Sequence, residues 1–387
     1  MDAKRRIFPR FYFVSDRDML SCLSASDVDG LVRLLPSMYT SLRQLENTRG
    51  EVTAFIAKDG VTIKNDQPLP FGNEPVETWM AKMDRALQVS MRKALQSCLA
   101  EFAKTQLRQW IFKWNAQLVD LVCKISLTQE LVEVVSVTGV AGLRSYLRKV
   151  LRLLEEQFRM STIAELTSGE RTVLSNMLAH QLHTRETVGA LIERDVATVD
   201  QLMAFPILHA SLKPSGDLVI SLCQTTHSYG FELRGNYATP VIHTFNYSAS
   251  RSLLISLAAG SASLLLGGVA TGKTELVSEI STLLGRYLCI LTCSRAFQDV
   301  DLLSSMKGCA AIGAILCFEN VQLFSEPTMA ALKTAISALY QARRANERVF
   351  TYRGTEIALN HDFACLATAT ASSPAELPDT VLLAFRP

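Results

Sequence analysis

The chain has very little net charge. Of its 387 residues, 39 are Lys or Arg and 37 are Asp or Glu, which leaves a formal net charge of +2. This balance gives no global attraction to nucleic acid or to an anionic membrane, so we expect neither as a partner. Only 20% of the residues are charged and 48% are hydrophobic, so the chain can bury a large core and is not disordered by composition.

The sequence also lacks a disulfide or metal-binding pattern of cysteines. Its nine cysteines are scattered along the chain. The closest pair, Cys289 and Cys293, has no further cysteine or histidine at the spacing of a zinc site. An odd number of cysteines without a pattern is typical of thiols that stay reduced.

No secretory signal is apparent, because no apolar run follows the charged start of the chain. One uncharged stretch, residues 252–272, is as long as a membrane-spanning helix. It is rich in glycine and serine, however, and it ends in a phosphate-binding signature. We therefore interpret it as a short helix over 253–259, a turn, and a buried strand over 263–266.

The first part of the chain, residues 1–225, is predicted to be a mainly α-helical domain. Apolar residues recur at helical spacing over 75–100, 106–127 and 143–160. The last of these stretches also carries regularly placed Arg, Lys and Glu residues. We interpret its charged side as a solvated helix face, with a basic docking face as the alternative.

The second part, residues 226–387, is predicted to be an α/β domain. Short apolar runs alternate here with helical stretches, which indicates a parallel sheet covered by helices on both faces. Strands are expected at 264–266, 288–291, 315–318 and 363–366, helices at 273–284 and 326–346, and a hairpin at 349–359.

A glycine-rich loop follows the first of these strands and opens a helix. It fits the pattern G-x-x-x-x-G-K-[ST] in full. Glycines let backbone N–H groups surround phosphate oxygens, and the helix N-terminus adds partial positive charge. The lysine can reach the β- and γ-phosphates of ATP, and the threonine can ligate Mg²⁺. The eight residues are Gly267, Gly268, Val269, Ala270, Thr271, Gly272, Lys273 and Thr274.

Further along, an apolar run over 315–318 ends in Glu319 and Asn320. A P-loop ATPase places its Walker B pair here: the first acid binds the metal with its water shell, and the second polarises the attacking water. Glu319 is one methylene longer than the usual Asp, so it is expected to hold Mg²⁺ less well, unless it is simply a polar strand end. The amide of Asn320 cannot accept a proton, and a missing general base typically costs about 10²–10⁴ in rate.

The chain resembles the dynein heavy chain family over nearly its whole length. Residues 4–16 resemble the FPRFYF segment of the dynein linker, and residues 229–236 resemble the YGYEYLGN segment that joins linker to ring. Residues 350–359 match the hairpin pattern F-x-x-x-G-x-E-I-x-L, and the ELP and FRP near the end match the family's closing motifs. The resemblance implies a linker, a mechanical lever in the family, joined to the large part of the first AAA+ module, with the small lid absent.

The resemblance also implies cofactors and further site residues. The cofactors would be ATP and Mg²⁺, with Val241 and Ile242 packed on adenine. Counting back from the ELP motif places Thr368 where the family has its sensor asparagine. Arg386 could face a neighbouring module's nucleotide or serve only the fold.

Partners and location follow from the same resemblance. The implied partners are the remaining AAA+ modules of a dynein motor ring. Dynein intermediate and light chains and microtubules are implied only through the parent assembly. The implied location is the cytoplasm and cytoskeleton, with a cilium or flagellar axoneme as the more specific alternative.

Three departures from the family concern catalysis. Glu319 and Asn320 replace Asp-Glu, Thr368 replaces the sensor asparagine, and the interior of the phosphate loop differs mildly. Together they predict nucleotide binding with weak or no hydrolysis. The leading hypothesis is therefore an ATP-binding segment of a dynein-like motor with its linker coupled to this site, either a fragment or a truncated relative. The alternatives are a structural or regulatory pseudo-ATPase, and an unrelated P-loop enzyme such as a small-molecule kinase, for which no acceptor motif is visible.

Overall fold

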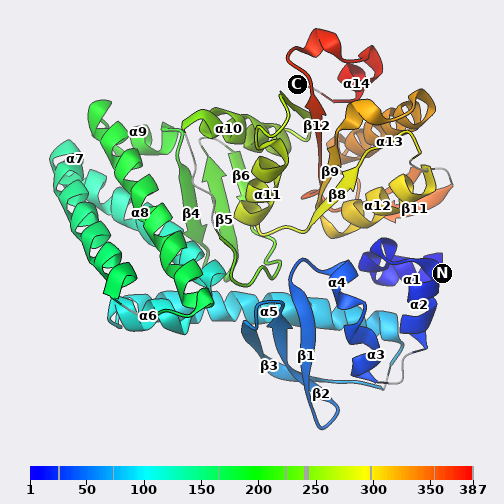
Figure 1. Ribbon diagram of the computed structural model, residues 1–387, viewed down its shortest axis with the longest axis horizontal. Helices are drawn as coiled ribbons and strands as arrows, with labels where there is room; N and C mark the ends of the chain where they lie inside the picture. The colour runs from blue at the N-terminus through cyan, green and yellow to red at the C-terminus, as the bar shows by residue number, and fades with distance from the viewer. Residues whose placement is uncertain are drawn as a thin grey trace.

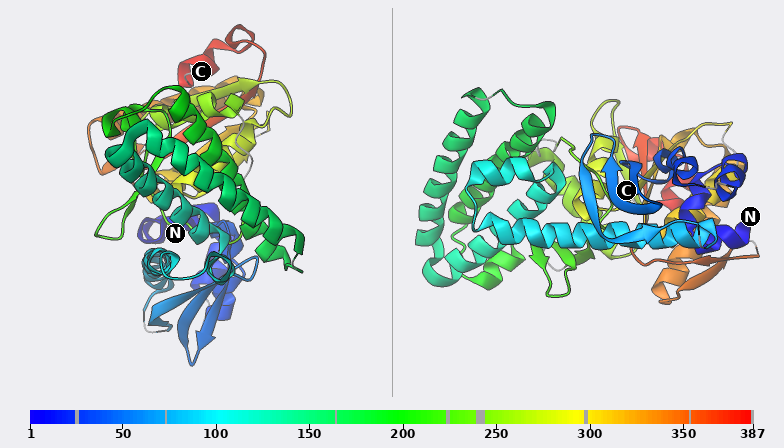
Figure 2. Two further views of the ribbon diagram at one scale, coloured as in Figure 1. Left: turned by 90° about the vertical axis from the view of Figure 1, so that its left-hand side faces the viewer. Right: turned by 90° about the horizontal axis from the view of Figure 1, so that it is seen from below.

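The computed structural model describes residues 1–24, 27–72, 74–163, 165–222, 225–238, 244–296, 299–352 and 354–385. Figure 1 shows an N-terminal part built from helices and two small sheets, and a C-terminal α/β part that lies against it. The long helix α5 (Val76–Phe102) runs beneath the α/β part in Figure 1, and Figure 2 shows it from below. None of the described helices is long and apolar enough to cross a membrane.

The chain begins with short helices and an antiparallel sheet of order β1-β2-β3. Aspartate and serine side chains cap two of these helices, because Ser15 and Asp27 accept bonds from backbone N–H groups three residues on. The elements are α1 (Asp2–Ile7), η1 (Pro9–Phe13), α2 (Asp16–Leu23), α3 (Val28–Val32), α4 (Leu35–Met38), β1 (Leu42–Thr48), β2 (Glu51–Ala57) and β3 (Thr62–Pro70).

Helices dominate the next stretch, as predicted. They are α5 (Val76–Phe102), α6 (Leu107–Lys113), α7 (Ala116–Ile163), α8 (Ser168–Glu193) and α9 (Val199–Ala204). The helical stretch expected over 106–127 is divided between α6 and α7, because Trp114 takes extended dihedrals. Asn115 then accepts a bond from Leu118 N through its side chain, which favours a new helix start. A reciprocal capping box of Thr167 and Glu170 begins α8.

A second antiparallel sheet, of order β4-β5-β6, follows these helices. Its strands are β4 (Leu208–Leu212), β5 (Leu218–Leu222) and β6 (Thr225–Ser228). The mainly helical character predicted for residues 1–225 is confirmed, but neither small sheet was expected. The predicted domain boundary at residue 225 stays a prediction, and β6, which pairs with β5, starts at that residue.

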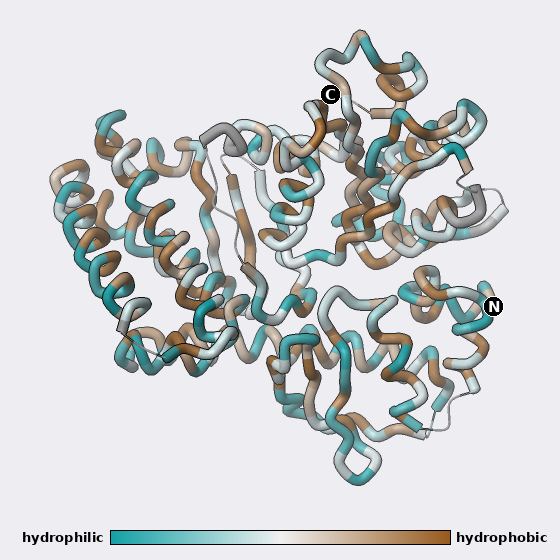
Figure 3. Tube along the Cα trace, viewed as in Figure 1, coloured by the Kyte–Doolittle hydropathy of each residue, from teal (hydrophilic) through white to brown (hydrophobic). Residues whose placement is uncertain are grey.

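The α/β part contains a parallel sheet of order β7-β12-β9-β8, as the alternating pattern predicted. Its central strand β9 is buried along nearly its whole length, and Figure 3 shows these strands mostly in brown. The elements are α10 (Thr244–Ala258), β7 (Ser263–Gly267), α11 (Lys273–Leu284), β8 (Leu288–Thr292), α12 (Asp299–Ile312), β9 (Ile315–Glu319), η2 (Val321–Leu323), α13 (Glu326–Arg344), β10 (Val349–Tyr352), β11 (Thr355–Ala358), β12 (Ala364–Thr370), η3 (Pro374–Glu376) and α14 (Asp379–Ala384).

These elements confirm the predicted strands, both predicted helices and the hairpin. Residues 252–272 form the end of α10, a turn and β7, so the helix–turn–strand interpretation is correct.

One hydrophobic cluster is shared by the two parts. A single buried cluster contains Met83 of α5, Leu118 of α7, Phe231 and Val277 of α11. The N-terminal segment also contacts the α/β part directly, since Ser304 of α12 donates a 3.0 Å bond to the carbonyl of Tyr12. The helical part is therefore packed onto the α/β part and is not a loosely tethered neighbour.

Candidate nucleotide site

The phosphate loop connects β7 to α11 and is largely exposed. Gly272, the residue that precedes α11, has φ of 80°, a left-handed conformation that glycine adopts without strain. No side chain caps the N-terminus of α11, so its first N–H groups are left for another acceptor. Exposed N–H groups and the positive end of a helix are what an anion site requires.

Lys273 lies over the loop to which it belongs. Its ammonium donates bonds of 2.9 Å to the carbonyl of Gly267 and 2.5 Å to that of Gly268, and it lies 3.5 Å from Thr271 Oγ1. The charge is therefore at the loop and is only partly buried. An anion bound by the loop amides would lie within reach of this side chain.

The first residues of α11 meet the end of β9. Thr274 Oγ1 donates a 2.8 Å bond to Glu319 Oε1, and Thr292 Oγ1 at the end of β8 donates a 3.2 Å bond to Glu319 Oε2. Hydroxyl and carboxylate oxygens are ligands that suit Mg²⁺. The described residues include no group of three or more His, Cys, Asp or Glu placed to hold a metal alone. A magnesium ion here would therefore need phosphate or water ligands as well.

Asn320 takes a left-handed conformation, with φ of 58°, directly after β9. Its backbone N–H donates a 3.2 Å bond to Thr368 Oγ1, and its side-chain Oδ1 accepts a 3.2 Å bond from Thr370 Oγ1. Asparagine tolerates this backbone shape better than most residues. The amide oxygen already has a protein donor, and the group cannot accept a proton from water.

The two threonines of β12 occupy different surroundings. Thr368 is 1% exposed, and its hydroxyl contacts the backbone of the β9 strand end. Thr370 is partly exposed and lies opposite Gly267, the first residue of the phosphate loop. The structure thus places Thr370 closer to the exposed end of the site than the expected Thr368. The missed signal is the two-residue alternation of a strand, which puts both threonines on one face.

Cysteines near this strand end are poor candidates for chemistry. Burial, with a smaller contribution from the charge of Glu319, raises the pKa of the Cys317 thiol to about 12. Cys317 is fully buried in β9. A thiol protonated at neutral pH fills core space and is not an activated nucleophile.

The structure brings together the loop 267–274, Glu319, Asn320 and Thr368, and adds Thr292 and Thr370, which the sequence did not suggest. Val241, Ile242 and Arg386 lie outside the described residues. Their expected roles against adenine and toward a neighbouring module stay predictions.

Two family models match the chain. One, described as the hydrolytic ATP binding site of the dynein motor region, matches residues 229–387. The other, described as dynein heavy chain, N-terminal region 2, matches residues 1–98. Together they cover about two thirds of the chain.

Individual relatives align along the entire chain. Human dynein axonemal heavy chains 3 and 1 are each 25% identical over 394 residues, and the dynein-1-beta heavy chain of the flagellar inner arm I1 complex of Chlamydomonas reinhardtii is 24% identical over 405. These alignments cover 100% of this chain and 9% of each relative. With a phosphate loop and strand-end acid on a parallel sheet, and matches of this kind at both ends, the chain belongs to the dynein heavy chain family.

Proposed function

We propose that this chain is an ATP-binding segment of a dynein-like motor, in which the N-terminal linker-like part is coupled to the nucleotide site and hydrolysis is weak. The observation that carries the proposal is the direct bond between Thr274 of the phosphate loop and Glu319 at the end of β9. It brings the phosphate-binding and metal-binding halves of a P-loop site to one point.

Each residue of the site has a proposed role. The N–H groups of 267–274 and the ammonium of Lys273 bind the phosphates. Thr274 and Glu319 would hold Mg²⁺, which would neutralise phosphate charge, and Thr292 orients Glu319 through its hydrogen bond. Val241 and Ile242 are proposed to contact adenine.

Weak hydrolysis follows from the end of β9. Asn320 occupies the position of the second acid and offers an amide in place of a carboxylate. Its side-chain oxygen accepts a bond from Thr370, so the amide is oriented but cannot remove a proton from water. We therefore favour slow turnover over efficient hydrolysis.

A non-hydrolysing pseudo-ATPase is the second candidate. The fully buried core shared by α5, α7 and α11 favours it, because a bound nucleotide would then stabilise both parts of the fold together. The two candidates differ only in phosphate release, since both require nucleotide binding.

The wider assembly is also a proposal, because the chain spans 9% of these relatives. We propose the other AAA+ modules of a motor ring as partners, and contact with intermediate chains, light chains and microtubules only through the assembled motor. The axonemal and flagellar names of the relatives favour the cytoskeleton of a cilium or flagellum within the cytoplasm.

The test is nucleotide binding by the full chain. We expect Mg-ATP to raise the melting temperature, and Lys273→Ala to weaken ATP binding about 10- to 100-fold, the effect of one charge-assisted bond. Lys333→Ala, on α13, is the matched control and should bind normally. If the folded wild-type chain, and a longer chain that continues as its relatives do, show no binding at millimolar ATP, the proposal is wrong. Phosphate release then separates the two candidates.

A further inference from the structure

Residues 229–236 connect β6 toward the α/β part through a buried, irregular segment, which we call the junction segment. It lies directly against the C-terminal end of α11, the helix that starts at the phosphate loop. Gly230 N donates a 2.9 Å bond to Leu284 O, and Glu232 N donates a 2.9 Å bond to Gly285 O. A Cβ at position 230 would lie 2.7 Å from Gly285 O, so only glycine fits this approach.

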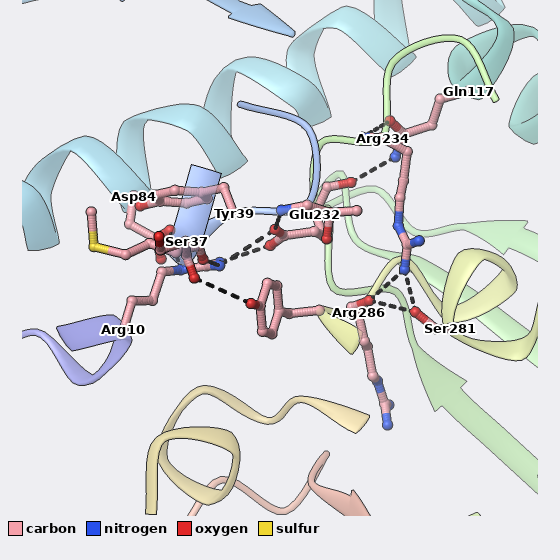
Figure 4. Close-up of polar contacts among 12 residues, drawn as sticks. Arg10, Ser37, Tyr39, Asp84, Gln117, Glu232, Arg234, Ser281 and Arg286 are labelled. Carbon is pink, nitrogen blue, oxygen red and sulfur yellow. Dashed lines mark hydrogen bonds and ion pairs between the residues drawn. The ribbon is translucent and has the colours of Figure 1, made fainter. Parts of the chain in front are cut away.

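Arg234 also binds this end of α11, and we call its side-chain contacts the clamp. Its side chain is buried, and Nη2 donates to Ser281 Oγ and, at 2.8 Å, to the carbonyl of Arg286. Ser281 Oγ in turn donates a 2.9 Å bond to that carbonyl. A cation at a helix C-terminus also interacts favourably with the helix dipole. Figure 4 shows Arg234 directed at Ser281 and at the backbone of Arg286.

The linker-like part holds the other side of the junction segment. Gln117 of α7 is fully buried and donates to Tyr229 Oη at 2.9 Å and to Glu232 O at 2.8 Å, while its Oε1 accepts from Arg234 N at 2.9 Å. The backbone of Arg234 is thus fixed to α7 and its side chain to α11. Arg234 therefore connects the linker-like part to the phosphate-loop helix.

The N-terminal segment reaches the same place. Arg10 Nη2 lies 2.7 Å from Glu232 Oε2, and Arg10 Nε lies 3.0 Å from Asp84 Oδ1 on α5. Figure 4 shows Arg10 and Glu232 on one side of the junction segment and Arg234 with Ser281 on the other. Contacts from η1, α5 and α7 therefore converge on a segment that also holds α11.

We propose that Arg234 is a positioning residue through which the linker-like part sets the affinity of the phosphate loop for nucleotide. Helix α11 runs from Lys273 to Leu284, so a shift at its clamped end is carried along a stiff rod of about 18 Å to the loop. The coupling is reciprocal. Contacts that hold the end of α11 favour the loop geometry that binds nucleotide, and bound nucleotide in turn favours those contacts. The inference rests on the proposed nucleotide binding.

Two substitutions test the side chain of Arg234. Arg234→Leu removes the side-chain donors to Ser281 Oγ and to the carbonyl of Arg286, and keeps an aliphatic group at this buried position. Arg234→Lys keeps the charge but loses the planar fork of the guanidinium.

The experiment measures the Kd for Mg-ATP and the melting temperature of the full chain. We expect Arg234→Leu to weaken Mg-ATP binding about 10-fold, Arg234→Lys to give an intermediate value, and Ser281→Ala to weaken binding about 3-fold. Arg92→Leu is the matched control. Arg92 stacks on Phe231 with its Cζ 4.8 Å from the ring centroid and pairs with Asp217, but it has no described contact with α11. It should lower the melting temperature without changing the Kd.

Two outcomes overturn the inference and are distinguishable. If wild type binds Mg-ATP and Arg234→Leu binds it equally well despite a lower melting temperature, Arg234 only stabilises the fold. If Arg234→Leu does not fold, an unchanged Kd in both Arg234→Lys and Ser281→Ala leads to the same conclusion. If wild type itself does not bind Mg-ATP, the proposed function fails and the inference falls with it.

Discussion

The hydroxyl of Thr274 and the carboxylate of Glu319 are joined by a 2.8 Å hydrogen bond, although 45 residues separate them in the sequence. The bond spans from the first turn of α11 to the end of β9. Glu319 has an extra methylene relative to aspartate, and its second carboxylate oxygen accepts a bond from Thr292. Both oxygens of the acid are therefore held by hydroxyls where a metal would be bound.

Glu319→Gln should reduce the effect of magnesium on ATP binding. The amide keeps the shape of the side chain but is a much poorer Mg²⁺ ligand than a carboxylate. We expect the gain in ATP affinity on adding Mg²⁺ to fall about 10-fold, while affinity in EDTA stays as in wild type. Glu326→Gln, in the first turn of α13, is the control that should retain the full magnesium effect. An unaltered magnesium effect in Glu319→Gln would remove Glu319 from the metal site.

Asn320→Glu should raise phosphate release if a general base is all that the site lacks. The expected gain is up to about 10²–10⁴. Glutamate is less suited than asparagine to a φ of 58°, at a cost of about 1–2 kcal/mol, so the variant is expected to melt earlier. Asn320→Gln has the same length without a base and is the matched control. Intact binding with no gain in turnover would show that more than the base is missing.

Thr368→Val should mainly affect stability, and Thr370→Val should mainly affect nucleotide binding. Thr368 is buried and accepts the bond from Asn320 N, so its loss should destabilise the fold by about 1–3 kcal/mol, the cost of an unpaired buried donor. Thr370→Val should alter the ratio of ATP to ADP affinity with a smaller loss of stability, because Thr370 pairs with Gly267 of the phosphate loop and its hydroxyl orients the amide of Asn320. Urea unfolding and nucleotide titration check the two effects. The reverse result would restore Thr368 as the nucleotide-sensing residue.

Removing one partner of the buried Arg10–Glu232 pair should lower the free energy of unfolding more than replacing both partners does. The side chains of Arg10 and Glu232 are 6% and 5% exposed. Arg10→Met leaves the carboxylate of Glu232 buried without its cation and should cost about 3–5 kcal/mol. Glu232→Gln should cost less, because Arg10 still pairs with Asp84 at 3.0 Å. The double variant should recover part of that loss, which a double-mutant cycle in urea measures. Breaking the exposed Lys149–Glu130 pair should have little effect. Additive losses in the Arg10–Glu232 cycle would mean that the two charges do not interact.

Acidification should destabilise the fold through His180. Burial lowers the pKa of His180 from 6.5 to about 4, with Asp120 opposing and Lys124 adding to that shift. The unfolded state therefore binds more protons between these pH values, so stability is full above about pH 6.5 and falls as the pH drops toward 4. Melting temperatures measured from pH 7.5 to 4.5 should fall less steeply for His180→Gln than for wild type. Parallel profiles would show that His180 is not responsible for the pH dependence.

The α/β part and its phosphate loop could be predicted from the sequence. Four apolar runs became the four parallel strands, and helix α11 spans the predicted residues 273–284. These signals are local: a buried parallel strand requires continuous apolar residues, and a phosphate loop requires glycines at fixed positions. The same local chemistry identified Glu319 and Asn320 as neighbours of the loop.

The small sheets, the supporting hydroxyls and the contacts of the junction segment could not be predicted from the sequence. Strand β3 is largely polar and exposed, so no alternation in the sequence marked it. Thr292 and Thr370 matter only because β8 and β12 end beside Glu319 and the phosphate loop. Arg10 and Glu232 are 222 residues apart, and Arg234 meets Ser281 only where the linker-like part packs on α11. The burial of a charge and the identity of its partner depend on which distant segment covers it. A local sequence pattern contains no information about that segment.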